Sequence, residues 1–319
     1  MARIFSRSWS ELEAHIELEK IRSTELKNEW INGHKEYQRI NLNDVWLTTN
    51  GFSHVYGAGF KQISWYAESY VYNKENYDLF PTDDRFDLRF HFNQNMCQYP
   101  RTQHLPIYTW WKGEMSLYEE TVKNKKPEFD FGMVLARKNE DRRQFPSCYL
   151  GWLRSHIVHA GRGRSMKYYG SGWEKNDPNY GGEAYIAGNA RSPEKFHDAR
   201  ILMTKAKFVW AVENTHDYFY SQNYLTEKIW HAFISASVPI YVGACNVHEM
   251  IDPSLFIDFR KFNYDPAAVM DYCEKMTESE YQGYIARIGE FLNKEGQKYT
   301  GESVFKELDY KINKFLCNE

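Results

Sequence analysis

Six polar side chains with the capacity to bind an anion or a sugar lie in one short stretch of the chain: Glu213, Asn214, Tyr224, Thr226, Glu227 and Lys228. Just before them, residues 208–212 form an apolar, β-rich run that reads as a buried strand. From Leu225 to Ala236 apolar residues recur at helical spacing. Ligands of parallel sheets bind at the carboxyl ends of the strands. The pattern therefore predicts a ligand site between this strand and this helix.

Lys228 indicates which kind of ligand is expected. It falls in the first turn of the predicted helix, where the backbone N–H groups already make the helix end positive. A lysine is unfavourable there unless an anion lies opposite, whereas Glu227 complements the helix dipole by itself. A solvated helix start explains the pair of residues equally well from spacing alone.

A basic stretch, residues 137–167, is a second candidate for anion binding. It holds eight lysine and arginine residues against Glu140 and Asp141. Guanidinium groups pair well with phosphate oxygens, so the stretch is consistent with a diphosphate site, although a solvated surface has the same composition.

The elements that must position these residues begin with one strand–helix–strand unit, residues 208–243, typical of a parallel α/β sheet. Further strands are predicted at residues 43–47, 60–66 and 129–136. The first forty residues are charged, and we expect helix there with no strand. Asp265 and Pro266 predict an N-cap and first helical residue, followed by amphipathic closing helices.

Length and composition limit the remaining possibilities. A chain of 319 residues usually forms one large domain or two, and the charged segment 114–127 predicts a boundary, giving domains 1–126 and 127–319. The net charge of -3 and the pI near 6.4 give no indication of a nucleic-acid partner. No apolar run approaches 18 residues, so no transmembrane segment is expected. Five cysteines without a CxxC pair favour reduced thiols and a cytoplasmic location, free or at the inner membrane face.

The central stretch also resembles a known family. The resemblance rests on Glu213-Asn214-Thr215, residues 224–228, Val238-Pro239-Ile240 with Gly243, and residues 253–257 followed by Phe259 and Phe262. In this order they are similar to the signature of the α1,3/1,4-fucosyltransferases, glycosyltransferase family ten. The resemblance implies the GT-B fold, in which two Rossmann-like α/β domains face each other across a cleft and C-terminal helices close the chain.

The same resemblance implies an inverting transfer of L-fucose from GDP-β-L-fucose to a GlcNAc-containing glycan acceptor, in α1,3 or α1,4 linkage. Glu68, at the end of an aromatic strand, occupies the place of the family's proposed catalytic base; by itself it reads as a solvent-facing loop residue. Arg143, with Arg142 as the next choice, corresponds to an arginine at the donor diphosphate. The remaining expected donor-binding residues are Asn214, Tyr224, Thr226, Glu227 and Lys228.

Three alternatives were weighed against this interpretation. A metal-dependent transferase needs a carboxylate pair at a strand end, whereas Glu128-x-Asp130 lies at a strand start and Asp83-Asp84 in a predicted loop, so no essential metal or other cofactor is expected. A transferase using another GDP-sugar would share the donor residues. A non-catalytic sugar-binding protein would use the aromatic surface alone and would not require Lys228 at a helix start. Trp110 and Trp111 could lie under an acceptor sugar, although one of the pair could equally belong to the core.

Overall fold

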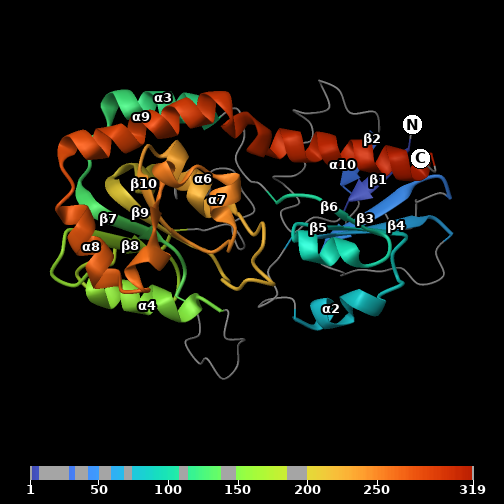
Figure 1. The fold of residues 1–319 in the computed structure, drawn as a ribbon, viewed down its shortest axis with the longest axis horizontal. Helices are drawn as coiled ribbons and strands as arrows, with labels where there is room; N and C mark the ends of the chain where they lie inside the picture. The colour runs from blue at the N-terminus through green and yellow to red at the C-terminus, as the bar shows by residue number, and fades with distance from the viewer. Residues whose placement is uncertain are drawn as a thin grey trace.

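The computed structural model describes residues 2–6, 29–32, 42–49, 59–67, 74–107, 114–137, 149–184 and 200–317. Within these ranges the chain forms two parallel β-sheets in separate lobes, with helices packed against them (Figure 1). This confirms the predicted α/β class. The strands of the first sheet are β1 (Arg3–Ser6), β2 (Glu29–Asn32), β3 (Val45–Thr49), β4 (Lys61–Tyr66), β5 (Leu88–His91) and β6 (Thr102–His104). The second sheet contains β7 (Phe129–Val134), β8 (Met166–Tyr169), β9 (Ala206–Val212), β10 (Val238–Val242) and β11 (Ile257–Asp258).

The two sheets share one connectivity. The described strands of the first sheet follow the order β2-β1-β3-β4-β5-β6, and those of the second follow β8-β7-β9-β10-β11. In each sheet the first strand in sequence pairs with both the second and the third, so the direction of winding reverses between them. In doubly wound sheets the ligand crevice lies at this reversal, beyond the carboxyl ends of the strands. For the second sheet, this point lies between β7 and β9.

The first forty residues differ from the prediction, which found no strand there. β1 and β2 are both present and pair in parallel over four residues each. Each is only four residues long, too short for an apolar alternation to stand out from a charged background. Their pairing depends on a distant partner, since β1 lies between β2 and β3.

The helices are α2 (Lys74–Leu79), α3 (Met115–Asn124), α4 (Gly151–Ala160), α6 (Glu227–Ile234), α7 (Val247–Met250), α8 (Pro266–Glu274), α9 (Glu278–Lys294) and α10 (Gly301–Leu316). Short 3-10 helices occur at residues 80–82, 94–98, 253–255, 259–262 and 296–299. α4 and α8 cover one face of the second sheet, while α6, α3 and α9 cover the other (Figure 1). The predicted cap of α8 is confirmed, because the Asp265 side chain accepts hydrogen bonds from Ala267 N and Ala268 N.

Two helices pack on partners that are distant in sequence. α3 precedes the second sheet but packs on α9, where Tyr118 Oη donates to Ile285 O at 3.0 Å. α10 ends the chain but buries Val304, Leu308 and Ile312 against the first sheet (Figure 1). The predicted grouping of all closing helices with the second domain therefore differs from the packing of α10. The boundary between residues 126 and 127 stays a prediction.

Candidate active site

The carboxyl end of β9 carries a buried carboxylate, Glu213, with no solvent exposure. The next strand leaves space for it, because a Cβ atom on Gly243 would collide with the Glu213 side chain. Glu213 Oε1 accepts a hydrogen bond from Thr226 N at 2.9 Å, and Oε2 accepts one from Thr226 Oγ1 at 2.6 Å. The end of β9 is thereby fixed to the residue that begins α6.

Lys228 lies in the first turn of α6, as predicted, and its ammonium group is held within the protein. Its Nζ lies 2.9 Å from Thr226 Oγ1, 3.1 Å from Glu213 Oε2 and 3.1 Å from Glu227 Oε1. Burial acts to lower the pKa of Lys228, but the two carboxylates outweigh it and raise the pKa to about 12. Lys228 is therefore a permanent cation, and its three N–H donors have partners in the chain.

Glu227 is the more accessible carboxylate of this group, with a side chain that is 20% exposed, whereas that of Glu213 has no exposure. Burial acts to raise the pKa of Glu227, but Lys228 and His231 lower it to about 2. An ionised Glu227 can accept hydrogen bonds from sugar hydroxyl groups. Removing one partner of a buried ion pair typically costs about 3–5 kcal/mol, so this network is also structural.

The crevice between β7 and β9 is bridged by an arginine that the sequence analysis grouped only with the general basic stretch. Arg154 on α4 is 2% exposed. It donates from Nη1 to Ala136 O beyond β7 and from Nη2 to Asn214 Oδ1 beyond β9, both at 2.9 Å. Arg154 falls on the same helical face as Leu150, Leu153 and Ile157, and this spacing could have predicted from the sequence that its side chain points inward.

Asn214 and Tyr224, two of the predicted donor residues, lie in this same network. Asn214 Nδ2 lies 3.4 Å from Tyr224 Oη, and Asn214 O accepts a hydrogen bond from Leu150 N. Tyr224 is 1% exposed, and its ring centroid lies 5.1 Å from that of Phe92 in the first lobe. The structure thus brings together Asn214, Tyr224, Thr226, Glu227 and Lys228. Their contacts with a donor stay a prediction.

The remaining predicted residues lie outside the described part of the chain: Glu68, Arg142, Arg143, Trp110 and Trp111. Glu68 follows Ala67, which is buried directly beyond β4. The neighbouring side chains at this edge are Tyr66 and His91, which are paired in the sheet and have stacked rings. Burial lowers the pKa of His91 well below its usual range, so its imidazole is neutral.

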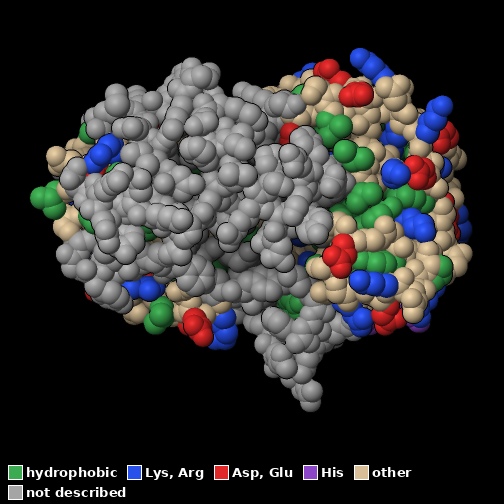
Figure 2. Space-filling view, turned by 180° about the vertical axis from the view of Figure 1, so that it is seen from behind, with side chains coloured by type: hydrophobic (Ala, Val, Ile, Leu, Met, Phe, Trp, Pro, Cys, Tyr) green, Lys and Arg blue, Asp and Glu red, His purple; other side chains and the backbone are tan. Residues whose placement is uncertain are grey.

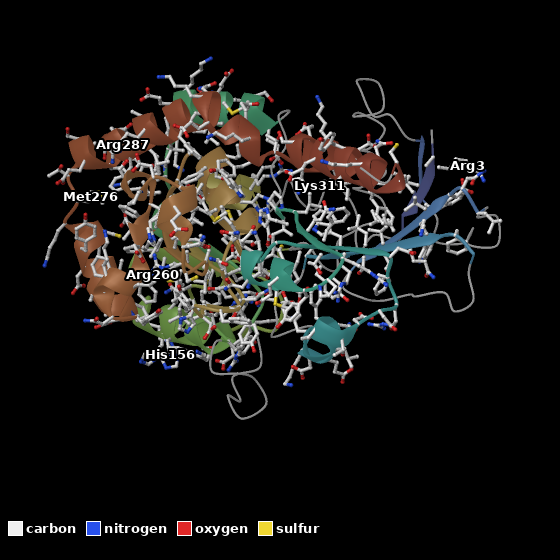
Figure 3. All side chains as sticks on the ribbon, turned by 45° about the vertical axis from the view of Figure 1, so that its right-hand side comes forward. Arg3, His156, Arg260, Met276, Arg287 and Lys311 are labelled. Atoms are coloured by element: carbon white, nitrogen blue, oxygen red, sulfur yellow. The ribbon has the colours of Figure 1, made fainter. Side chains whose placement is uncertain are left out.

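A second arginine that sequence reasoning missed, Arg260, lies beyond β11 and is labelled in Figure 3. It forms a two-pronged ion pair with Asp258, at 2.8 Å and 2.9 Å. It also donates from Nη1 to Cys245 O at 2.9 Å, which ties the end of β11 to the loop after β10. Arg260 thus orders this edge of the second sheet; it lies within the family-like run of residues 253–262, but the apolar residues of that run did not mark the role of the arginine.

Two of the carboxylates considered for a metal, Asp83 and Asp130, have cationic partners. Asp83 Oδ1 lies 2.8 Å from Arg85 Nε, and Asp130 lies 3.8 Å from Lys207. Among the described residues no group of three or more histidine, cysteine or acidic side chains is arranged to hold a metal ion.

Basic and acidic side chains intermingle on the described surface of the second lobe (Figure 2). In the described ranges, no helix combines the length and apolarity needed to cross a membrane.

Comparison with known proteins matches this region to a family. Residues 167–298 match the model described as glycosyltransferase family 10 (fucosyltransferase) C-term. An α-(1,4)-fucosyltransferase of Arabidopsis thaliana is 36% identical over 97 residues, covering 30% of this chain and 20% of that protein. GDP-fucose protein O-fucosyltransferase 3 of Danio rerio is 22% identical over 252 residues, 78% of this chain and 50% of that protein. The chain therefore spans half or less of these curated relatives.

Solved structures show the same fold. A crystal structure of an α1,3-fucosyltransferase with GDP superposes with a TM-score of 0.59 at 17% identity, covering 100% of this chain and 91% of the other. An α-glucosyltransferase in complex with UDP and DNA gives a TM-score of 0.55 at 11% identity, covering 98% and 99%. The two-lobed arrangement is the GT-B fold, as predicted. Residues 167–298 of this chain are thus similar to the C-terminal domain of glycosyltransferase family 10, the fucosyltransferase family.

Proposed function

We propose that this protein is an inverting fucosyltransferase that moves L-fucose from GDP-β-L-fucose to a hydroxyl group of a GlcNAc-containing glycan. The observation that carries the proposal is the buried network of Glu213, Glu227 and Lys228 at the start of α6. It lies at the carboxyl edge of the second sheet, where α/β sheets bind nucleotides. The family match covers this same segment.

In the proposed donor complex, the diphosphate faces the N-terminus of α6. The backbone N–H groups there and the cationic Lys228 favour an anion. Glu227, the more accessible carboxylate, turns toward a ribose or fucose hydroxyl and so releases one N–H of Lys228 for a phosphate oxygen. Arg143 supplies a second cation, while Arg154 holds Asn214 in place beside the donor.

The proposed chemistry is a single displacement. Glu68 takes the proton of the acceptor hydroxyl as its oxygen attacks the anomeric carbon of fucose, and the bond from that carbon to GDP breaks. Attack from the opposite face converts the β-linked donor into an α-linked product. GDP leaves as an anion, and the growing charge is stabilised by the cations and by the helix N-terminus at Thr226.

The linkage is proposed as α1,3, with α1,4 as the alternative. The named relatives include both kinds, since one is called an α-(1,4)-fucosyltransferase and one solved structure is of an α1,3-fucosyltransferase. The hydroxyl groups at positions 3 and 4 of GlcNAc are neighbours, so the orientation of the bound acceptor decides which of them receives fucose. Methylation analysis of the product distinguishes the two linkages.

We also propose that the reaction needs no essential metal and takes place in the cytoplasm, free or at the inner membrane face. The metal proposal is supported by Lys228, whose ammonium group is paired with both carboxylates at the site. The proposed location is supported by Cys97, Cys245, Cys273 and Cys317, the described cysteines, which carry free thiols.

Two experiments test the proposal. Incubation with GDP-fucose and a panel of glycans, read by mass spectrometry, should add one fucose mass to GlcNAc-containing acceptors. No product across the panel would contradict it, and transfer from GDP-mannose instead would favour a different donor. In a thermal-shift assay GDP should stabilise the protein, while free oligosaccharide alone should not. The opposite result would favour a non-catalytic sugar-binding protein.

A further inference from the structure

A tight turn between Glu213 and Tyr224 presents aromatic side chains at the junction of the lobes. We call residues 217–221 the aromatic turn; they are Asp217, Tyr218, Phe219, Tyr220 and Ser221. Asp217 Oδ1 accepts hydrogen bonds from Phe219 N at 2.7 Å and from Tyr220 N at 3.1 Å. Ser221 Oγ donates to Asp217 O at 2.6 Å and accepts from Asp217 N at 3.0 Å. Four hydrogen bonds therefore close a loop of only five residues.

The turn is also braced from both lobes. From the second lobe, Cys245 N donates to Ser221 Oγ at 3.1 Å, and Cys245 Sγ lies 3.5 Å from Tyr218 O. From the first lobe, Asn93 Nδ2 donates to Phe219 O at 2.5 Å. The Tyr77 ring in α2 also contacts the Tyr220 ring, with centroids 6.5 Å apart. The backbone of Tyr218 is thus held in one conformation before any ligand binds.

Despite this order, the Tyr218 side chain is 86% exposed, the highest value among the large hydrophobic residues that the structure describes. Its neighbour Phe219 is 39% exposed. A single exposed aromatic ring is common on protein surfaces. The difference here is that the chain fixes the backbone, at an entropic cost, without burying the ring that it carries. A ring on a backbone already fixed in this way loses little further conformational freedom when a ligand packs on it.

The surroundings of the turn decide what covers the ring. The turn follows Glu213, which begins the donor network, and contacts Asn93, which lies two residues beyond β5 of the first sheet. In the proposed reaction, the acceptor lies next to the donor at this junction of the lobes. The turn carries Asp217, which repels phosphate, and has no cationic side chain of its own. A neutral ligand with an apolar face suits it, and the C–H face of a pyranose is such a surface.

We propose that Tyr218 is a stacking platform for a sugar residue of the acceptor glycan, and this inference rests on the proposed fucosyl transfer. The ring fixes the orientation of the acceptor next to the donor edge. Tyr218 is accordingly a positioning residue, which acts on acceptor affinity and linkage, and it takes no part in proton transfer.

The test compares wild-type protein with Tyr218→Ala and Tyr218→Trp, and uses Tyr310→Ala as the matched control. Tyr310 is 61% exposed and lies on α10. With a Galβ1,4GlcNAc disaccharide as acceptor, Tyr218→Ala should raise the acceptor KM by roughly tenfold, equivalent to about 1.4 kcal/mol. The KM for GDP-fucose and the Tm should stay unchanged. Tyr218→Trp should retain the wild-type acceptor KM, and so should Tyr310→Ala.

A direct binding measurement separates this inference from the proposed reaction. Saturation-transfer NMR of the disaccharide, recorded with and without GDP, needs no turnover. Loss of the signal in Tyr218→Ala, with retention in Tyr310→Ala, supports the platform even if the donor proves to be another GDP-sugar. Equal signals in wild-type protein and Tyr218→Ala, or an unchanged acceptor KM, overturn the platform while leaving the proposed fucosyl transfer intact.

Discussion

The two sheets have the same strand connectivity, but the side chains at their carboxyl edges differ in charge. At the second sheet the edge holds ionised side chains: Lys228 between Glu213 and Glu227, and Arg154 across the crevice. At the first sheet the described strand ends carry two uncharged rings, Tyr66 and His91. The charges nearest to Tyr66 are the ion pair of Asp83 and Arg85, with Tyr66 Oη 3.2 Å from Asp83 Oδ2. Burial raises the pKa of Tyr66 and lowers that of His91, so both side chains are uncharged at neutral pH.

This difference is consistent with each of the two similar sheets binding a different substrate. A nucleotide diphosphate carries its charge into the complex and needs fixed cations and helix N–H groups. A glycan hydroxyl is neutral and needs only a base at the point of attack. Changes at the two edges should therefore have different effects.

Changing Glu68 tests whether the first edge supplies the base. Glu68→Gln keeps the size and hydrogen-bonding reach of the side chain but cannot accept the proton. Turnover should fall about 10²–10⁴-fold. GDP affinity and Tm should stay unchanged, since the donor is proposed to bind at the other edge. The measurements are initial rates, calorimetry with GDP and thermal unfolding.

The matched control is Glu75→Gln, an exposed glutamate in the first turn of α2, which should leave all three quantities unaltered. Fucose transfer by Glu68→Gln at near the wild-type rate would place the base elsewhere in the first lobe.

Changing Lys228 tests the charged edge. Lys228→Ala removes a charge-assisted contact worth about 1.5–3 kcal/mol, so the Kd of GDP measured by calorimetry should rise tenfold or more. It also leaves Glu213 buried without its counter-ion and should lower the Tm. The double variant Lys228→Ala/Glu213→Gln removes the buried charge as well, so it should regain Tm without regaining GDP affinity.

Lys294→Ala serves as the control for a lost lysine, because Lys294 forms an exposed ion pair on α9. GDP binding at wild-type affinity by the folded double variant would assign Lys228 a purely structural role.

Changing the two arginines of the basic stretch sharpens the donor assignment. Arg143→Ala should weaken GDP binding about tenfold, the usual effect of losing one charged hydrogen bond to phosphate. Arg142→Ala should have little effect. Parallel titrations with GDP and guanosine separate a phosphate contact from a general loss of binding, because only GDP affinity should change. The reverse ranking would exchange the roles of these neighbours.

The sequence predicted the second lobe better than the first. In the segment 208–243 a strand, a helix and a second strand are close together, so local periodicity was enough to place Thr226, Glu227 and Lys228 at a helix start. β1 and β2 were missed because four-residue strands carry little local pattern and depend on pairing with β3.

Side-chain partnerships were harder to predict than elements. Lys228 was expected to face a ligand, and its position in α6 was right, but its contacts with Glu213 and Glu227 depend on how β9 meets the helix. Arg154 belongs to a helix far from Asn214 in sequence, and only the folded sheet brings the two together. Distant contacts of this kind leave no periodic signal in the chain.

The dependence of GDP binding on pH tests whether the charged edge is permanent. The pKa of Lys228 is raised to about 12 from 10.5, so the stabilisation from its ion pairs is complete below about pH 10 and is lost as the pH rises through 12. The pKa of Glu227 is lowered to about 2 from 4.5, so its contribution is complete above about pH 5 and is lost as the pH falls through 2. Phosphate groups titrate near pH 6.

GDP affinity measured by calorimetry between pH 7.5 and 8.5, where the guanine ring also keeps its N1 proton, should therefore change less than about twofold, or about 0.4 kcal/mol. A steep loss of affinity within that window would mean that the donor-binding cation titrates there and is not Lys228.

Removal of divalent ions should have the smallest effect of all. At the second edge Lys228 already contacts both Glu213 and Glu227, so a divalent ion would have to displace a lysine whose pKa is raised to about 12. In the proposed mechanism, the cationic side chains and the helix N-terminus supply the charge that a metal ion would otherwise bring to the leaving diphosphate. Initial rates with and without EDTA should be the same within error.

The Lys228→Ala variant is the informative comparison, because its two carboxylates lose their shared cation. Its residual rate should respond to added Mg²⁺ more than the wild-type rate does. Wild-type activity abolished by EDTA and restored by Mg²⁺ or Mn²⁺ would show that a metal, and not Lys228, neutralises the diphosphate.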